Sequence, residues 1–195
     1  MLLTFAEVEF LVALADDEPA VDVAMLLDEP TRDRHDMVSA GLASLMAREL
    51  LVEHLDESGT AGFVLDPQVV ALHTAMHSAT TSVKITTVTP ERTTYWLLLV
   101  GAQRSALTPV AAGVYAAVVM PMSGDVREQV VSLVSSALAD EPSAGVAISR
   151  DGSAEAMSFR TNAELGGPSA SRAERLEAIE AFVDEIFVNH HPSAG

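Results

Sequence analysis

Apolar residues in the first third of the chain recur every three or four positions, a spacing typical of amphipathic helices. They predict one helix from Thr4 to about Ala15, a short second helix over Val21–Leu27 and a third over Arg32–Arg48. Thr4 and Glu7 have the spacing of a capping box, in which the hydroxyl and the carboxylate each accept a backbone N–H near the helix start. The N-terminal part is therefore expected to be helical. The apolar stripe of the third helix consists of Met37, Ala40, Leu42, Leu45 and Met46.

The pattern changes to two short apolar runs after the third helix. Leu50–Val52 and Phe63–Leu65 flank a turn at Asp56–Gly59, which predicts a strand, a turn and a second strand. Pro67 suits the first turn of a helix because its missing N–H needs no partner there, and apolar spacing extends this helix over Pro67–Ser78. The order of helix, strand, turn and strand resembles the last helix and wing of a winged helix.

The next stretch is rich in β-branched residues, which favours strands. Short turns connect four runs, so an antiparallel meander is expected from Val83–Val88, Thr93–Val100, Ser105–Val110 and Gly113–Met120. The last run is apolar on both faces and is expected inside the sheet. Val83–Val88 is expected at a sheet edge, where Lys84 would discourage pairing with another chain.

The C-terminal part predicts two helices with a hairpin between them. The helices run from about Asp125 to Ala139 and from Ser171 to about Val188, with Leu176 in the buried stripe of the second. Ser171 and Glu174 have the spacing of a capping box at the start of the second helix. Asp151-Gly152 suits a type I′ turn between strands at Val146–Ser149 and Glu155–Phe159. The predicted class is α+β. A helical, winged-helix-like part over residues 1–78 precedes an antiparallel sheet with flanking helices over residues 79–195, and the two share one core.

The composition and charge of the chain bear on the partners that it can bind and on its location. The chain has 49% apolar residues, no cysteine and a net charge of −17, and its first 66 residues hold 3 basic and 15 acidic side chains. Such a charge opposes binding to nucleic acid and to anionic membranes. The start of the chain lacks the basic region of a signal peptide, and no apolar run approaches the roughly 18 residues of a membrane span. A cytoplasmic protein is expected.

His73 and His77 are the strongest candidates for metal binding. They lie one turn apart on a predicted helix, a spacing that can present two imidazoles to zinc. Thr74 stands where a His-Glu-x-x-His motif has its glutamate, and no third ligand is near in sequence, so both are interpreted as surface or boundary residues. His190-His191 are expected to be exposed on a tail over Asn189–Gly195.

The basic residues of the helical part are the candidates for DNA binding. Arg32, Arg34, His35 and Arg48 would occupy the recognition helix and wing of a DNA reader, but acidic neighbours cancel their charge. Local ion pairs are the favoured interpretation.

The remaining sequence motifs do not indicate a catalytic site. The acidic clusters Asp16–Glu18 and Asp184-Glu185 are read as a solvated face, and Gly166-Gly167-Pro168 as part of a loop over Asn162–Ala170. Neither a Gly-x-Ser-x-Gly elbow nor a Walker-type phosphate loop is present. Tyr95 and Trp96 face opposite sides of one strand, so one is expected in the core and one within reach of a partner. No catalytic, cofactor-binding or metal residue is predicted.

One longer pattern resembles a known family. Leu42–Leu51, then Gly62–Leu72 with its Asp66-Pro67 step, then a helix and a β-meander are similar to the start of the EspG family, as is the opening Leu3–Phe10. Arg48-Glu49-Leu50-Leu51 occupies an Arg-Gly-Leu-Leu-like step of that family, with Glu49 where glycine is usual. The resemblance implies a cytosolic chaperone of type VII secretion that binds the helical tip of a secreted pair. The sheet over Val83–Met120 and the helix after Ser123 would then form the partner surface.

Three functions remain open at this point. A non-enzymatic protein-binding adaptor or secretion chaperone fits the acidity and the missing catalytic motifs. A winged-helix transcriptional regulator would instead place Arg32, Arg34 and Arg48 on one positive face. An enzyme with a scattered site is the third. A homodimer through the edge at Val83–Val88 or through a sheet face is also compatible with the pattern.

Overall fold

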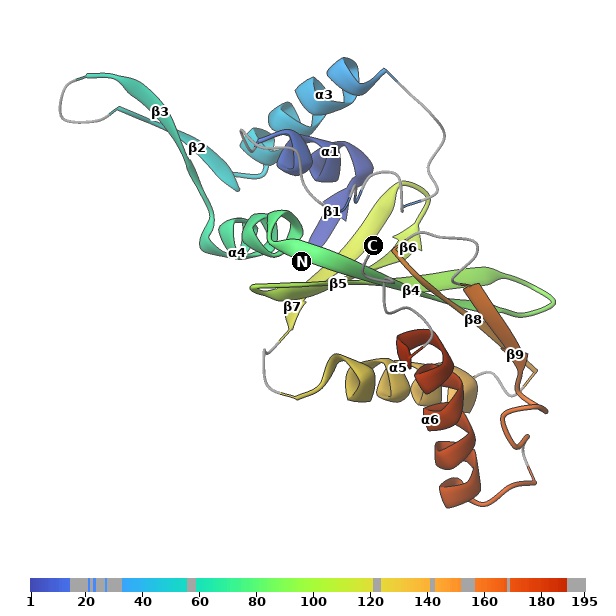
Figure 1. The fold of residues 1–195 in the computed structure, drawn as a ribbon. Helices are drawn as coiled ribbons and strands as arrows, with labels where there is room; N and C mark the ends of the chain where they lie inside the picture. The colour runs from blue at the N-terminus through green and yellow to red at the C-terminus, as the bar shows by residue number, and fades with distance from the viewer. Residues whose placement is uncertain are drawn as a thin grey trace. The chain divides into compact units, whose positions relative to one another are not determined.

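The computed structural model describes residues 1–14, 21, 23, 27, 33–55, 59–120, 124–140, 143–151, 157–167 and 169–188. The described part contains five helices and nine strands, which confirms the α+β class (Figure 1). In chain order they are β1 (Leu2–Thr4), α1 (Phe5–Ala13), α3 (Arg34–Ala47), β2 (Leu51–Leu55), β3 (Ala61–Leu65), α4 (Pro67–His77), β4 (Ala79–Val88), β5 (Thr93–Gly101), β6 (Arg104–Ala111), β7 (Val114–Met120), α5 (Val126–Asp140), β8 (Gly145–Arg150), β9 (Met157–Thr161) and α6 (Arg172–Val188).

Seven strands form one antiparallel sheet in the order β1-β7-β6-β5-β4-β8-β9, and β2 and β3 form a second sheet. The predicted meander of β4 to β7 is confirmed. The edge position expected for Val83–Val88 is wrong, because β8 pairs with this stretch from Val83↔Arg150 to Val88↔Gly145. β7 lies between β1 and β6, as expected for an interior strand, yet Val118 and Val119 near its end are exposed.

The chain divides into two compact units. Unit 1 comprises Met1–Thr80 and Leu99–Pro121, and unit 2 comprises Thr81–Leu98 and Met122–Gly195. The β6–β7 hairpin thus groups with the N-terminal helices, unlike in the expected division into residues 1–78 and 79–195. The single shared core and the winged-helix likeness stay predictions.

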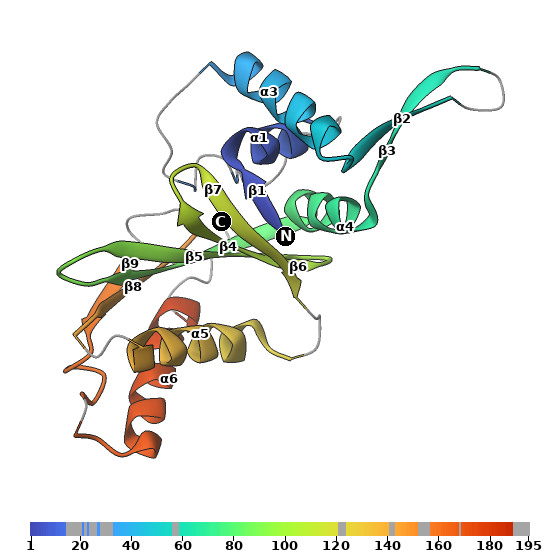
Figure 2. The same ribbon diagram turned by 180° about the vertical axis from the view of Figure 1, so that it is seen from behind.

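Unit 1 is built on a close contact between α1 and α3, which lie side by side in Figures 1 and 2. A Cβ on Gly41 would lie 2.0 Å from the carbonyl oxygen of Ala6, so only glycine permits this approach. The expected stripe of α3 is right only in part. Leu45 is buried, together with Gly41, and Met37 and Leu42 are partly buried, whereas Ala40 and Met46 are exposed. The helix begins at Arg34 because Asp33 caps it, accepting the N–H of His35 at 2.9 Å.

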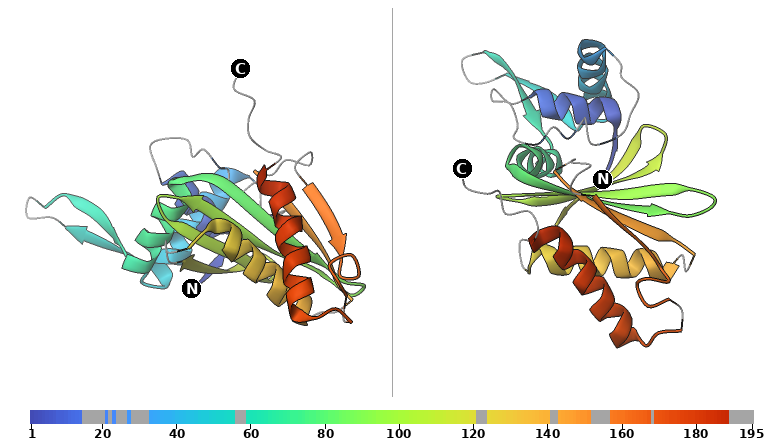
Figure 3. Two further views of the ribbon diagram at one scale, coloured as in Figure 1. Left: turned by 60° about the horizontal axis from the view of Figure 1, so that its bottom comes forward. Right: turned by 45° about the vertical axis from the view of Figure 1, so that its right-hand side comes forward.

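Unit 2 consists of strands β4, β8 and β9 with the first part of β5, and of α5 and α6, which pack on each other and on β8 (Figure 3). The expected buried faces hold at Val130, Val134 and Leu138 of α5 and at Ile179, Val183 and Ile186 of α6. Leu176 was expected on the buried face of α6, but this is wrong, because its side chain is 42% exposed. Asp151 has a left-handed φ of 53°, but the expected two-residue turn at Asp151-Gly152 is wrong. That turn would pair position 150 with position 153, whereas the register of β8 and β9 pairs Ser149 with Met157, so the connection is longer.

Some sequence predictions fall outside the described residues. They include most of the helix at Val21–Leu27, the turn at 56–58, Gly152 and the tail at 189–195. None of the helices that the structure describes has the length and apolar character needed to cross a membrane.

Candidate protein-binding surface

The β2–β3 hairpin carries the most exposed apolar side chains of unit 1. Its strands pair antiparallel from Leu51↔Leu65 to Leu55↔Ala61, so directly opposed residues share a face. Val52 and Val64 are opposite each other on one face, 52% and 55% exposed. Leu55 and Phe63 lie on the other face, 61% and 59% exposed. The hairpin therefore offers apolar area on both faces.

The hairpin extends away from the helices of unit 1 (Figures 1 and 2). Among the described strands, β2 and β3 pair only with each other. An isolated two-stranded hairpin is only marginally stable in water, and exposed apolar clusters are typical of protein interaction sites. We therefore treat Val52, Leu55, Phe63 and Val64 as the candidate site and call them the hairpin cluster.

The base of the hairpin is fixed at the end of α3. The N–H of Leu50 donates to Leu45 O at 2.9 Å and that of Glu49 to Met46 O at 3.0 Å, which together form a Schellman motif. Glu49 takes a left-handed φ of 58°, a conformation that favours glycine. On the other strand, the N–H of Asp66 donates to Leu50 O at 2.9 Å and its carboxylate caps α4. Both ends of the hairpin are thus held by the backbone.

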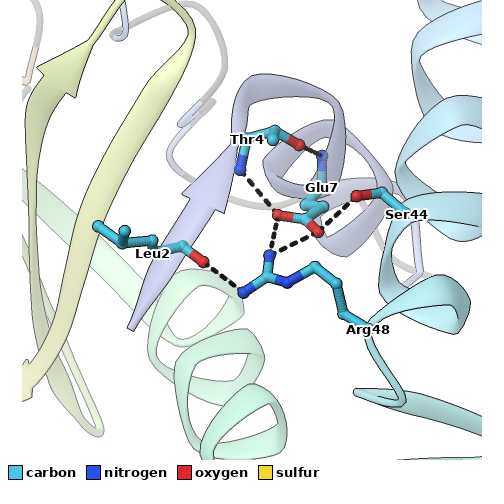
Figure 4. Close-up of polar contacts among 5 residues, drawn as sticks. All are labelled: Leu2, Thr4, Glu7, Ser44 and Arg48. Carbon is cyan, nitrogen blue, oxygen red and sulfur yellow. Dashed lines mark hydrogen bonds and ion pairs between the residues drawn. The ribbon is translucent and has the colours of Figure 1, made fainter.

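A buried ion pair strengthens the same base (Figure 4). The Glu7 carboxylate, which is fully buried, accepts Arg48 Nη1 at 2.7 and 2.8 Å and Ser44 Oγ at 2.8 Å. It also accepts the N–H of Thr4 at 2.7 Å, and Thr4 Oγ1 accepts that of Glu7, so the predicted capping box is confirmed. Arg48 Nη2 donates to Leu2 O at 3.0 Å. The guanidinium therefore connects β1 and α1 to the residues that lead into β2.

Arg34 and Arg48 do not form one positive face. Arg34 pairs with Glu9 at 3.3 Å and Arg48 with Glu7, so both partners are on α1 instead of among the sequence neighbours expected. The two residues stand at opposite ends of α3, which places them roughly 21 Å apart along the helix axis. Arg32 lies outside the described residues. This geometry gives no support to a DNA-reading surface.

A shallow apolar hollow of about 380 Å³ adjoins the start of α4 in unit 1. It is lined by Met1, Pro67, Gln68, Ala71, Leu72, Ala117, Val118 and Val119. Because Pro67 follows β3 after a single residue, the hollow lies close to the base of the hairpin. Strands β4 and β5 have few exposed side chains. Tyr95 is buried in the core and Trp96 is partly exposed, as was expected of one of the two.

The imidazoles of His73 and His77 contact each other, with ring centroids 4.4 Å apart. His77 Nε2 lies 3.1 Å from Leu11 O, whereas His73 Nε2 is buried without a hydrogen-bond partner in the described structure. No group of three or more metal-ligating side chains occurs within the described ranges. The pair is a packed contact between α4 and the end of α1, which agrees with its interpretation as boundary residues.

The histidine contact predicts a pH dependence of stability. Burial lowers the pKa of His73 below its ordinary 6.5, and the neighbouring His77 lowers it further. Because the unfolded chain takes up this proton more readily, the contribution is full above pH 6.5 and is lost as the pH falls through 6.5 toward the lower folded value. We expect the loss of unfolding free energy between about pH 7.5 and 5.5 to be smaller in His73→Gln than in the wild type. Urea denaturation measures it, with exposed His54→Gln as control; equal losses in all three proteins would contradict it.

Asp184 and Glu185, which were interpreted as part of a solvated acidic face, both form ion pairs within unit 2. Arg127 pairs with Asp184, and Arg160 Nη2 with Glu185 at 2.7 Å. Asp16–Glu18 and His190-His191 lie outside the described residues. No protein-family model matches the chain, and no curated protein matches its sequence.

Proposed function

We propose that this chain is a non-enzymatic, cytosolic protein-binding adaptor or secretion chaperone, possibly of the EspG type. The hairpin cluster is the observation that carries the proposal. Four large apolar side chains, each more than half exposed, stand on an element that needs a cover to be stable. The partner is another protein, most simply a helical segment whose apolar side covers one face of the hairpin.

The details at the hairpin base are consistent with the EspG-type assignment. The resemblance places glycine at the position of Glu49, and Glu49 has the left-handed backbone that glycine adopts without strain. The order α3, β2–β3 hairpin, α4 and meander also follows the order that the resemblance implies. The resemblance pointed to the sheet and the helix after Ser123 as the partner surface. The proposal gives the hairpin the larger share, because only Thr80, Val88 and Thr93 are exposed in strands β4 and β5.

Substitutions in the hairpin cluster test the proposal. Phe63→Ser and Leu55→Ser remove exposed side chains, so the fold should keep its stability while partner binding weakens about tenfold or more for each. A partner is first captured by the wild-type protein from cells of the source organism and identified, and its purified form is then titrated against each variant. Val70→Ser changes a valine of α4 that is 44% exposed and lies outside both the hairpin and the sheet over Val83–Met120, so it is the matched control and should bind normally.

Two results would contradict the proposal. One is unchanged partner affinity in both hairpin variants. The other is salt-sensitive retardation of duplex DNA by the pure protein, which would favour the winged-helix regulator instead.

A further inference from the structure

Unit 2 contains a hollow of about 510 Å³ between α5, α6 and the loop before α6. This volume lies within the usual range of small-molecule sites. Its lining residues are Ser135, Ser136, Ala139, Ala170, Arg172, Arg175, Leu176 and Ile179. A second hollow of about 340 Å³ adjoins it and shares Ser135, Arg172 and Leu176.

The charge of the first hollow is opposite to that of the chain. The chain has 28 acidic and 11 basic residues, yet the lining contains two arginines and no carboxylate. Other basic side chains of unit 2 have acidic partners: Arg127 pairs with Asp184, Arg150 with Asp151 and Arg160 with Glu185. Within the described residues, Arg172 and Arg175 have neither a hydrogen bond nor an ion pair through their side chains. Two guanidinium groups are therefore available at one place.

Two carboxylates of the preceding loop and of the first turn of α6 are engaged elsewhere. Glu174 accepts the N–H of Ser171 at 2.8 Å, in the predicted capping box of α6. Glu164 accepts the N–H of Thr161 at 2.7 Å and its hydroxyl at 2.8 Å. The hydrogen bonds from Ser171 lower the pKa of Glu174, and those from Thr161 lower the pKa of Glu164. Both acids thus stay charged and bound to backbone N–H groups of their own turns, so neither of them pairs with the two arginines.

The loop before α6 also positions Arg175. Gly166 has a φ of 96°, and a Cβ there would lie 3.1 Å from Arg175 Cγ. The absent side chain lets the loop pack on the aliphatic stem of Arg175. Ser135 also lines the hollow, but its hydroxyl oxygen is buried and is not presented to a ligand. The charged groups of the hollow are therefore the two arginines of α6.

The remaining lining is apolar. Leu176 was expected in the core of unit 2 but is 42% exposed, and Ile179, Ala139 and Ala170 line the same hollow. In the second hollow, Glu128 and Glu180 stand near Arg172 and disfavour an anion there.

We propose that the first hollow binds a small ligand with an anionic head and an apolar body. The head, a carboxylate or a phosphate monoester, is held by Arg172 and Arg175, and the body lies on Leu176 and Ile179.

Four probes of equal chain length test this site: octanoate, octyl phosphate, 1-octanol and octylammonium. Isothermal titration calorimetry on the full-length protein should show 1:1 binding of octanoate, octyl phosphate or both. The neutral and cationic probes should bind at least about tenfold more weakly. Binding of octanoate alone would assign a carboxylate, and of octyl phosphate alone a phosphate ester. The proposal would be overturned if neither octanoate nor octyl phosphate bound, or if octylammonium bound as tightly as the anions.

Matched variants distinguish anion binding in the hollow from non-specific attraction of anions to the protein. Arg172→Gln and Arg175→Gln should each weaken anion binding about tenfold, whereas Arg92→Gln removes the same charge in an exposed turn and should have no effect. Ser136→Leu, which fills the hollow but keeps both arginines, should also abolish binding. Circular dichroism checks the fold of each variant. Retained binding in both arginine variants would overturn the assignment. The hairpin variants should bind the probes normally, so this test and that of the proposed function can fail independently.

Discussion

Replacing Gly41 by alanine is expected to destabilise unit 1 by about 2 to 3 kcal/mol. The new Cβ would lie 2.0 Å from the carbonyl oxygen of Ala6 and 2.8 Å from Phe10 Cβ. Two backbones must separate to admit it, because a carbonyl cannot rotate away as a flexible side chain can. Intrinsic helix propensity acts in the opposite direction, since alanine is favoured over glycine by about 1 kcal/mol in a helix interior. Loss of stability would show that packing between α1 and α3 outweighs propensity.

Urea denaturation with two matched variants measures this effect. Ala43→Gly changes an exposed position of the same helix and should cost about 1 kcal/mol through propensity alone. Gly62→Ala adds a Cβ whose nearest contact is 3.9 Å away, so it should change stability little. A Gly41→Ala protein at least as stable as the wild type would mean that α1 and α3 are further apart than described.

Local patterns predicted much of the fold. The capping boxes at Thr4 and Ser171, the start of α4 at Pro67 and the strands of the meander were all readable, because each depends on residues within a few positions. The edge assignment of Val83–Val88 failed for the opposite reason. Its second neighbour, β8, comes from some sixty residues further along the chain, and no local pattern encodes that pairing.

The candidate site was predictable only in part. The two strands of the hairpin were expected, but their apolar runs gave no sign that both faces would be exposed. An apolar run of this length fits a buried strand equally well. Likewise, Leu176 keeps the spacing of a core residue although it opens onto the hollow of unit 2. Exposure depends on which distant elements arrive to cover a surface, and spacing alone does not contain that information.

The ion pair at the hairpin base shows the same limit. Glu7 was assigned to its capping box, which is correct, but its pairing with Arg48 links residues 41 positions apart. Arg48 was weighed as a DNA contact and as part of a local ion pair, but its ion-pair partner Glu7 is not local. Its guanidinium contacts Glu7 of α1 and Leu2 of β1, and its backbone leads into β2, so this residue couples the core of unit 1 to the surface proposed to bind a partner.

Arg48→Met is therefore expected to cost about 2 to 3 kcal/mol of unfolding free energy. Breaking a buried ion pair by removing one partner usually costs about 3 to 5 kcal/mol, because the remaining charge is desolvated without compensation. Here Glu7 is fully buried but the Arg48 side chain is 40% exposed, so water partly replaces the guanidinium and reduces the cost. The double variant Glu7→Gln/Arg48→Met should recover part of the loss, since no buried charge remains.

Arg34→Met is the matched control for this experiment. It removes a guanidinium from the same helix, paired with the same neighbouring helix, but Arg34 is 60% exposed and its contact with Glu9 is 3.3 Å. The Glu9 side chain is only 11% exposed, but it makes a further interaction besides this pair, so the loss should be smaller, about 1 kcal/mol. Chemical denaturation of the four proteins measures the difference. Similar losses for Arg34→Met and Arg48→Met would mean that the Glu7 carboxylate is hydrated, and the hairpin base would then depend on its Schellman motif alone.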